Sequence, residues 1–335
     1  MKKLAIGVDI GGINTAFGLV DENGDLYAES VISTKKYPYV DDYPAYVRDL
    51  CDAMHAMAKS LSFDYELTGI GIGAPNANYH KGTVETPANL WKFRDGDPNP
   101  DESRRIFPLA SDISNCFGGV KTLITNDANA ATIGEMIYGN AKGMKDFIMI
   151  TLGTGLGSGF VANGEMVYGH DGFAGEFGHI PFFDNEIICS CGKKGCLETE
   201  VSGIAIEDKM RHMIEKGVNT ILKKQYDEQR TVHIDDIINA AMNDDNLSIE
   251  LIEEAGEKVG KAIAFLINTF NPETVIVGGN LAAAGDYIML PLKSATNKYS
   301  LNLVYKDTKF RVSKMTENAN AWGVAMLIRN KIIGL

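Results

Sequence analysis

Two distant segments of the chain share one pattern of strand and turn residues. Residues 6–27 and 148–168 each contain an apolar stretch, a glycine-rich turn, a second apolar stretch, an Asn-Gly pair and a third apolar stretch. Asn-Gly favours the tight turn that joins adjacent antiparallel strands. Residues 68–73 likewise resemble residues 274–279. The repeats predict two related α/β halves with a cleft between them; the alternative is coincidence, because glycine is common at strand ends.

The length and charge of the chain agree with such a two-part globular protein. Its 335 residues are about twice the usual domain length, and 45% of them are hydrophobic. The formal net charge of −12 repels phosphate backbones, and no basic stripe offsets it locally. We therefore expect no nucleic-acid partner.

The first residues and the apolar runs bear on the compartment. Met1, Lys2 and Lys3 lead directly into the apolar residues 4–8, which leaves no room for a secretory signal. The apolar runs are shorter than the roughly 20 residues of a membrane span. The sequence therefore predicts a cytoplasmic protein without a membrane partner.

Helical periodicity is clearest in two segments. Residues 43–61 and about 248–270 place apolar side chains at helical spacing, and a last helix is expected near residues 320–328. The polar, proline-containing residues 92–108 are typical of a surface loop.

Two glycine turns occupy equivalent places in the predicted halves, at residues 9–15 and 152–157. Their exposed amides could bind one polyphosphate from both sides of a cleft. Neither turn is followed by the Gly-Lys-Ser/Thr of a Walker A loop. Asp9 ends the strand before the first turn, where it either binds magnesium through water or caps the turn. The alternative for the glycines is an ordinary β-turn role.

A second acidic residue, Asp127, follows the apolar residues 122–124 and precedes a predicted helix. Open α/β sheets bind their ligands at the carboxyl ends of strands, which is where this side chain is expected. A carboxylate there could accept the proton of an attacking hydroxyl group. A plain helix cap explains the residue equally well.

The most specific motif combines one histidine with three cysteines: His179, Cys189, Cys191 and Cys196. These residues supply a complete tetrahedral set of nitrogen and sulfur ligands, which predicts a closed, structural Zn²⁺ site. The alternative is a group of free thiols beside an unrelated histidine. Cys51 and Cys116 lie apart from this motif and are expected to be buried thiols.

Together these motifs resemble the ROK family (repressors, open reading frames and sugar kinases) along nearly the whole chain. The segments that carry the resemblance are residues 8–12, 71–75, 125–130 and 152–157, and the His/Cys spacing is its most discriminating part. The resemblance implies an actin-like bilobal fold of two RNase-H-like domains around a cleft. The small domain would span residues 1–124, completed by a helix over about 318–335, and the large domain residues 125–317.

The resemblance also implies an ATP-dependent sugar kinase that uses Mg²⁺ and carries a structural Zn²⁺, with Asp127 as general base and a homodimer or homotetramer as its assembly. The residues implied for sugar binding are Asn89, Asn126, Glu176, His179 and Glu198. Those implied for the nucleotide and its magnesium are Asp9, Gly11, Gly12, Thr15, Gly153, Thr154, Gly278 and Gly279.

The expected acceptor is a hexose, with glucose first, because Glu176, His179 and Glu198 could bind ring hydroxyls without an acetamido pocket. N-acetylglucosamine, N-acetylmannosamine, fructose and allose stay open, since Ile13, Asn76 and the long loop after Trp91 depart from the usual family pattern. Family repressors carry a DNA-binding region before the first turn, whereas here a strand is expected from Leu4. The acidic residues and glycine turns argue against a sugar-binding protein without turnover.

Overall fold

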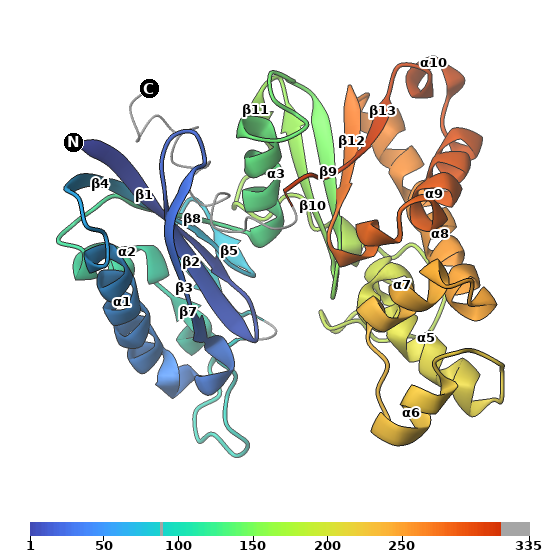
Figure 1. Cartoon of the computed structure of the whole chain (residues 1–335), viewed down its shortest axis with the longest axis horizontal. Helices are drawn as coiled ribbons and strands as arrows, with labels where there is room; N and C mark the ends of the chain where they lie inside the picture. Colours follow the sequence, from blue (N-terminus) through green and yellow to red (C-terminus); the bar gives the residue numbers. More distant parts are fainter. Residues whose placement is uncertain (88–89, 316–335) are drawn as a thin grey trace. The chain divides into compact units, whose positions relative to one another are not determined.

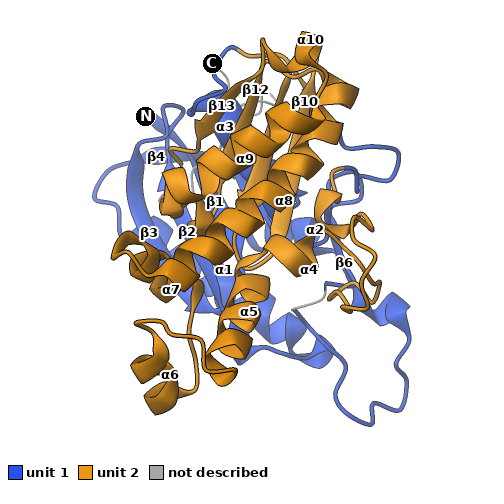
Figure 2. Ribbon diagram, turned by 90° about the vertical axis from the view of Figure 1, so that its right-hand side faces the viewer, with its two compact units in different colours: residues 1–143, 166–174, 317–335 blue, residues 144–165, 175–316 orange. Residues whose placement is uncertain are grey.

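The computed structural model of the chain describes residues 1–87 and 90–315. They form two compact units, which are coloured separately in Figure 2. Among the described residues, unit 1 contains Met1–Gly143 and Met166–Ala174, and unit 2 contains Met144–Glu165 and residues 175–315. The two compact units divide after residue 143, whereas the sequence predicts a domain boundary after residue 124. The predicted boundary concerns domains that fold as units, and it stays a prediction. The expected helix near the C-terminus and Asn89 lie outside the described residues.

Unit 1 is built on a five-stranded mixed sheet with the order β3-β2-β1-β4-β8. β1 pairs antiparallel with β2 and parallel with β4, and β4 pairs parallel with β8. The parallel strands β1, β4 and β8 therefore end at the same edge of the sheet. The strands are β1 (Lys2–Ile10), β2 (Asn14–Val20), β3 (Leu26–Ser33), β4 (Tyr65–Gly73) and β8 (Thr122–Thr125).

Three helices and a small second sheet complete the described part of unit 1, as Figure 1 shows. The helix expected over residues 43–61 is α1, and it buries Leu50, Cys51 and Met54 against the sheet as its periodicity predicts. The elements are α1 (Tyr43–Lys59), α2 (Leu109–Cys116), α3 (Asp127–Ile137), β5 (Ala77–Asn78), β6 (Thr83–Glu85), β7 (Ile106–Phe107) and the 3₁₀ turns Thr34–Lys36, Val40–Asp42 and Glu102–Arg105.

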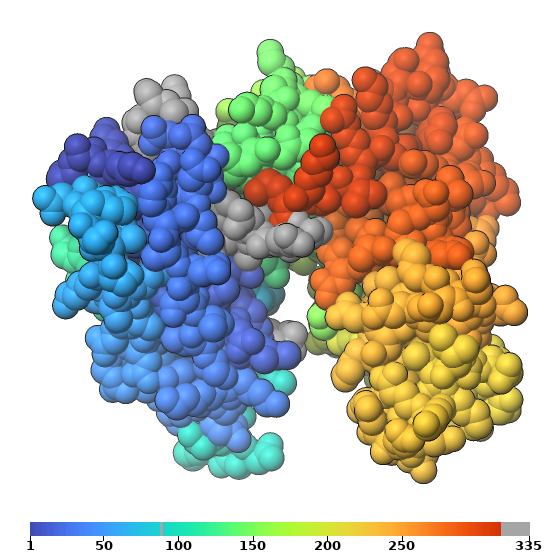
Figure 3. Space-filling view, in the orientation of Figure 1, coloured from blue at the N-terminus to red at the C-terminus, as the bar shows by residue number. Residues whose placement is uncertain are grey.

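The long loop after Trp91 projects from one end of unit 1, where Figures 1 and 3 show it in teal at the lower edge. Arg104 donates to the Asp97 carboxylate over 2.8 Å and to Asp41 over 3.2 Å, so the loop is tied both to itself and to the 3₁₀ turn that precedes α1. The surface-loop prediction for this segment is confirmed, apart from the short strand and helix turn at its end.

Unit 2 repeats the sheet of unit 1, with the strand order β11-β10-β9-β12-β13. β9 pairs antiparallel with β10 and parallel with β12, which pairs parallel with β13. The two related α/β halves expected from the sequence repeats are therefore confirmed. The strands are β9 (Phe147–Leu152), β10 (Leu156–Ala162), β11 (Glu165–Met166), β12 (Thr274–Gly278) and β13 (Lys309–Val312).

The helices of unit 2 include a long pair, α8 and α9, which lie side by side in Figure 2 and run in the same direction, since Gly256 packs on Ile288 and Gly260 on Leu292. α8 begins where the Asp245 carboxylate accepts the Ser248 amide over 3.0 Å, and it ends at Asn271 in a left-handed conformation. Gly256 allows close packing, because a Cβ there would lie 2.6 Å from the Ile288 carbonyl oxygen. The helices are α4 (Glu198–Val201), α5 (Gly203–Glu215), α6 (Lys223–Gln229), α7 (Ile234–Met242), α8 (Asn246–Phe270), α9 (Asp286–Tyr299) and α10 (Asn302–Tyr305), with 3₁₀ turns at Phe177–His179 and Asn280–Ala284. Within residues 1–87 and 90–315, none of the helices combines the length and apolarity needed to cross a membrane.

Candidate functional site

The carboxyl ends of three parallel strands meet at one edge of the unit 1 sheet. The strand register pairs Asp9 of β1 with Gly73 of β4, and Gly73 with Thr125 of β8. Asn126 and Asp127 follow Thr125 directly. This edge is where an open α/β sheet binds its ligands, and it brings two acidic residues from distant parts of the sequence together.

Gly73 lies between these acidic residues. A Cβ at this position would lie 3.2 Å from the Ala130 Cβ, 3.8 Å from the Asp127 Cα and 3.9 Å from Asp9 Oδ1. A side chain here would therefore crowd α3 at Ala130 and the start of α3 at Asp127, as well as the Asp9 carboxylate. No role was predicted for Gly73 from the sequence, although its place as the last residue of a buried strand was a usable signal.

Asp127 is the first residue of α3, and the residue that caps this helix is Asn126. The Ala128 amide donates both to Asn126 Oδ1 and to Asp127 Oδ1, each over 2.8 Å. Among the described residues, Asp127 Oδ2 accepts no hydrogen bond. The Asp127 carboxylate therefore has a free oxygen at the sheet edge, beyond what capping of α3 requires.

The carboxyl groups of Asp9 and Asp127 both have a pKa above the ordinary value. Burial, and secondarily the charge of Asp127, raise the pKa of Asp9 to about 6. Desolvation also raises the pKa of Asp127, opposed by the hydrogen bond from the Ala128 amide. Asp127 is exposed at the surface of the described residues, so solvent also screens its charge. A raised pKa suits a group that accepts a proton near neutral pH.

The first glycine turn joins β1 to β2 beside Asp9. The Gly11 amide closes the turn by donating to the Asn14 carbonyl over 2.9 Å, and the Ile13 side chain is 68% exposed at its tip. Thr15 differs from these neighbours because it is fully buried. Its hydroxyl group forms hydrogen bonds with the hydroxyl groups of Thr34 and Tyr46, each over 2.8 Å. Thr15 therefore has a structural role in the core, which competes with its predicted contact to the nucleotide.

The second glycine turn joins β9 to β10 in unit 2 and exposes Thr154. Beside it, β12 ends with Gly278 paired to Thr151 of β9. Gly279 has a φ of +83°, and a Cβ there would overlap the main chain of Leu152. The unit 2 residues predicted to bind the nucleotide thus come from two adjacent strand ends, and the backbone approaches closely enough to require glycine at Gly279.

The predicted metal ligands gather in one place. The ligand atoms of His179, Cys189, Cys191 and Cys196 all lie within 4.8 Å of one another. Cys189 Sγ lies 3.4 Å from His179 Nδ1, and Cys191 Sγ lies 3.7 Å from Cys196 Sγ. Tetrahedral Zn²⁺ with ordinary bond lengths separates its donor atoms by roughly 3.5–3.8 Å. The donor set and its spacing therefore fit Zn²⁺, and the sulfur–sulfur distance is too long for a disulfide.

Short backbone hydrogen bonds shape the loop that carries these ligands. The Cys189 amide donates to the Lys193 carbonyl, and the Gly192 amide donates to the Cys189 carbonyl, each over 2.8 Å. Gly192 and Gly195 have φ values of +81° and +72°, a conformation that favours glycine. These turns bring three cysteines close together within eight residues.

Three predicted sugar-binding residues lie in or beside this metal loop. His179 directs Nδ1 towards Cys189, while its Nε2 lies 3.9 Å from Glu176 Oε2. Glu198 begins α4 two residues after Cys196, and its Oε1 lies 3.4 Å from Ser190 Oγ. The loop therefore brings Glu176, His179 and Glu198 together, while the predicted contact Asn126 belongs to unit 1.

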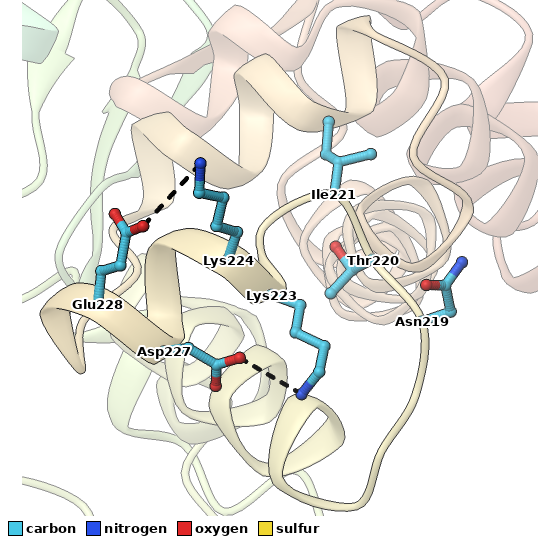
Figure 4. A pocket seen from close by; sticks show the side chains of 7 residues that line it. All are labelled: Asn219, Thr220, Ile221, Lys223, Lys224, Asp227 and Glu228. Atoms are coloured by element: carbon cyan, nitrogen blue, oxygen red, sulfur yellow. Dashed lines mark ion pairs between the residues drawn. The ribbon is translucent and has the colours of Figure 1, made fainter.

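One hollow on the surface contains none of the predicted site residues. A shallow depression of about 440 Å³ lies over α6, as Figure 4 shows, and is lined by residues that include Thr220, Lys223 and Lys224. Its charges are paired within the helix, Lys223 with Asp227 over 3.7 Å and Lys224 with Glu228 over 4.0 Å. Its solvated ion pairs give it no evident binding chemistry.

Comparison with known proteins places the chain in a family. The model of the ROK family matches residues 5–331, and the chain belongs to that family. Its two mixed five-stranded sheets form the actin-like two-domain fold that the resemblance implied.

Individual relatives include both enzymes and regulators. The chain is 30% identical over 335 residues to a glucokinase of Halalkalibacterium halodurans, covering 97% of this chain and 95% of that protein. A solved ROK family glucokinase from Streptomyces griseus, in complex with glucose and AMPPNP, matches with a TM-score of 0.77 and 28% identity, covering 97% and 98% of the two chains. A ROK family transcriptional regulator matches with a TM-score of 0.86 and 25% identity, covering 99% of this chain and 79% of the other.

Proposed function

We propose that this protein is an ATP-dependent sugar kinase that phosphorylates a hydroxyl group of a hexose, with glucose as the first candidate and glucose 6-phosphate as its product. The observation that carries the proposal is the Asp127 carboxylate, which keeps one oxygen without a hydrogen bond from residues 1–87 and 90–315 at the edge where β1, β4 and β8 end. Similarity to glucokinases along nearly the whole chain supports the same reaction.

In the proposed reaction, Asp127 accepts the proton of the sugar hydroxyl as its oxygen attacks the γ-phosphorus of ATP. The new oxygen–phosphorus bond forms while the bond from the γ-phosphorus to the bridging oxygen breaks, and ADP leaves. The raised pKa of Asp127 supports this role, because a more basic carboxylate takes up the proton more readily.

Asp9 and the glycine turns serve the nucleotide in this proposal. Asp9 would hold Mg²⁺ through water, and the ion would neutralise charge on the phosphates. A cation would also favour the ionised form of Asp9, whose pKa is otherwise raised to about 6. The amides of the turns after β1 and β9, with Gly278 and Gly279, would contact the nucleotide.

The sugar would be bound by Asn89, Asn126, Glu176, His179 and Glu198. His179 would hold Zn²⁺ through Nδ1 and leave Nε2 available for a hydrogen bond. With four protein ligands the metal site is closed, so the ion would hold the loop and take no part in the reaction. Glucose is favoured because these side chains suit ring hydroxyls, and the acceptors to compare with it are N-acetylglucosamine, N-acetylmannosamine, fructose and allose.

A sugar-responsive regulator is the second candidate, favoured by the likeness to the solved transcriptional regulator. Such a protein would bind sugar without turnover, and its acidic net charge of −12 would have to be overcome wherever it met nucleic acid. A kinase uses Asp127 directly, whereas a sugar-binding regulator has no need of a proton acceptor.

The deciding experiment is an assay of ADP release with Mg²⁺, ATP and a panel of hexoses, accompanied by calorimetric titration with each sugar. Turnover with one hexose supports the kinase, and glucose as the preferred acceptor supports the finer assignment. Sugar binding without ADP release would contradict the kinase and favour the regulator. The reduced thiolates of the metal loop suit the cytoplasm, and light scattering would test the expected homodimer or homotetramer.

A further inference from the structure

The glycine turn after β9 is held at both ends by the short segment that follows the metal loop. The Leu156 amide donates to Glu198 Oε2 over 2.9 Å, and the Gly203 amide donates to the Gly153 carbonyl over 2.7 Å. Residues 198–203 come directly after the metal ligand Cys196. The turn predicted to bind the nucleotide is therefore in direct contact, within unit 2, with the segment that carries Glu198, which is predicted to bind the sugar.

The Glu198 carboxylate makes this connection with both of its oxygens. While Oε2 accepts the Leu156 amide, Oε1 lies 3.4 Å from Ser190 Oγ and 3.7 Å from Cys189 Sγ. One side chain thus contacts the glycine turn on one side and the metal loop on the other. A shift of this carboxylate would alter both groups of contacts.

Gly155 determines where that carboxylate can lie. A Cβ added at Gly155 would lie 2.5 Å from Glu198 Oε2 and 3.3 Å from its Cδ, which is closer than packed atoms allow. The φ of Gly155 lies outside the left-handed region, so its backbone would accept a side chain. Gly153, in the same turn, has no atom within 4 Å of its added Cβ. The two glycines therefore differ in one respect, the presence of Glu198.

We propose that Gly155 is a positioning residue for the sugar half of the site, acting through the Glu198 carboxylate. Its missing side chain lets Glu198 reach the Leu156 amide while it stays beside the metal loop. A methyl group at position 155 would displace the carboxylate, because the end of a glutamate side chain moves more easily than the surrounding backbone. The effect on sugar binding rests on the proposed function, whereas the contact itself does not.

The matched variants Gly155→Ala and Gly153→Ala test the inference, with sugar affinity measured by calorimetry and the KM for sugar and for ATP measured separately. Gly155→Ala should weaken sugar binding on the order of 10-fold, because a hydrogen bond to a charged group is disturbed. Its KM for sugar should rise more than its KM for ATP. Gly153→Ala should leave sugar affinity within about twofold of wild type. Equal sugar affinity in the two variants would overturn the proposal.

A double-mutant cycle tests the contact without relying on kinase activity. Gly155→Ala is combined with Glu198→Ala, and each protein is measured by thermal unfolding and by the rate of zinc release to a chelator. Removing the carboxylate removes the clash, so Gly155→Ala should destabilise the Glu198→Ala background no more than Gly153→Ala does. If Gly155→Ala alone fails to fold, Glu198→Ala must restore folding. An unchanged effect of Gly155→Ala in both backgrounds would overturn the proposed contact, even for a protein that phosphorylates no sugar.

Discussion

The two sheets of this protein have the same strand order but different chemistry at their equivalent edges. In unit 1 the register pairs Asp9 with Gly73, and in unit 2 it pairs Thr151 with Gly278. The glycine is kept at this place in both sheets, whereas the carboxylate occurs in unit 1 alone. The shared topology therefore supplies two close backbone approaches, and single residues decide which of them carries acidic chemistry.

The acidic side chains near the two sheet edges also differ in what they contact. At the unit 1 edge, α3 adds a second acidic residue, Asp127, near Asp9. At the unit 2 edge, Glu198 is engaged by the Leu156 amide over 2.9 Å and supports the glycine turn. Unit 1 thus places a carboxylate where it can accept a proton, while unit 2 uses one to hold its backbone in place.

The largest expected effect comes from removing the proton acceptor of unit 1. Asp127→Asn keeps the shape of the side chain, and the cap of α3 survives because Asn126 provides it. We expect kcat to fall on the order of 10²-fold or more, with the unfolding temperature nearly unchanged. Steady-state kinetics and circular dichroism would measure this. A kcat close to wild type would show that the acidic edge of unit 1 is structural.

Asp9→Asn should separate activity from stability. Without the carboxylate, we expect the response of turnover to Mg²⁺ to weaken and kcat/KM for ATP to fall on the order of 10-fold or more. Titration of turnover against Mg²⁺ would measure this, with Thr151→Asn, the equivalent position in unit 2, as the comparison.

Asp9→Asn should raise the stability of the protein at neutral pH, although it lowers its activity. The folded pKa of Asp9, about 6, lies above the unfolded value of 3.8. The contribution of protonated Asp9 to the free energy of unfolding is therefore fully present below about pH 4, and it is lost as the pH rises through about 6. The variant should be more stable than wild type at neutral pH, on the order of 1 kcal/mol, and equal near pH 4. Urea unfolding across this range would contradict the prediction if the difference did not depend on pH.

Cys191→Ser weakens the metal loop of unit 2 without removing a predicted sugar contact. We expect the variant to lose Zn²⁺, to unfold at a lower temperature, and to raise the KM for sugar more than the KM for ATP, because the loop positions Glu176, His179 and Glu198. Metal analysis with steady-state kinetics would check this, and Cys116→Ser offers a control at a cysteine that is exposed, not buried as the sequence predicted, and lies away from the loop. Loss of Zn²⁺ with an unchanged KM for sugar would break the link between metal and sugar.

The smallest effect on activity is expected from Thr15→Val. This change keeps the shape of a buried side chain but removes the hydroxyl that bonds Thr34 and Tyr46. Stability should fall by about 1–2 kcal/mol, while the KM for ATP changes by less than about twofold. A large rise in that KM would restore the nucleotide contact first assigned to Thr15.

Local patterns in the sequence were sufficient to predict the repeated strands, the helix α1 and the four-residue metal cluster. Each depends on spacing within a short segment: alternating and helical periodicity for the elements, and three cysteines within eight residues for the cluster. The short strands β5, β6, β7 and β13 were not anticipated, because two to four residues carry too little periodicity.

Tertiary structure decided the features that depend on residues far apart in the chain. The register of β1, β4 and β8 brings Asp9, Gly73 and Asp127 together, and no local pattern fixes that register. The burial of Thr15 depends on the neighbouring Thr34 and Tyr46. The requirement for glycine at position 155 comes from the Glu198 carboxylate, 43 positions later in the sequence. The sequence by itself determined which side chains are available for chemistry, because composition and spacing are local properties. The partners of these side chains were decided by tertiary packing, because packing brings together residues that are far apart in the chain.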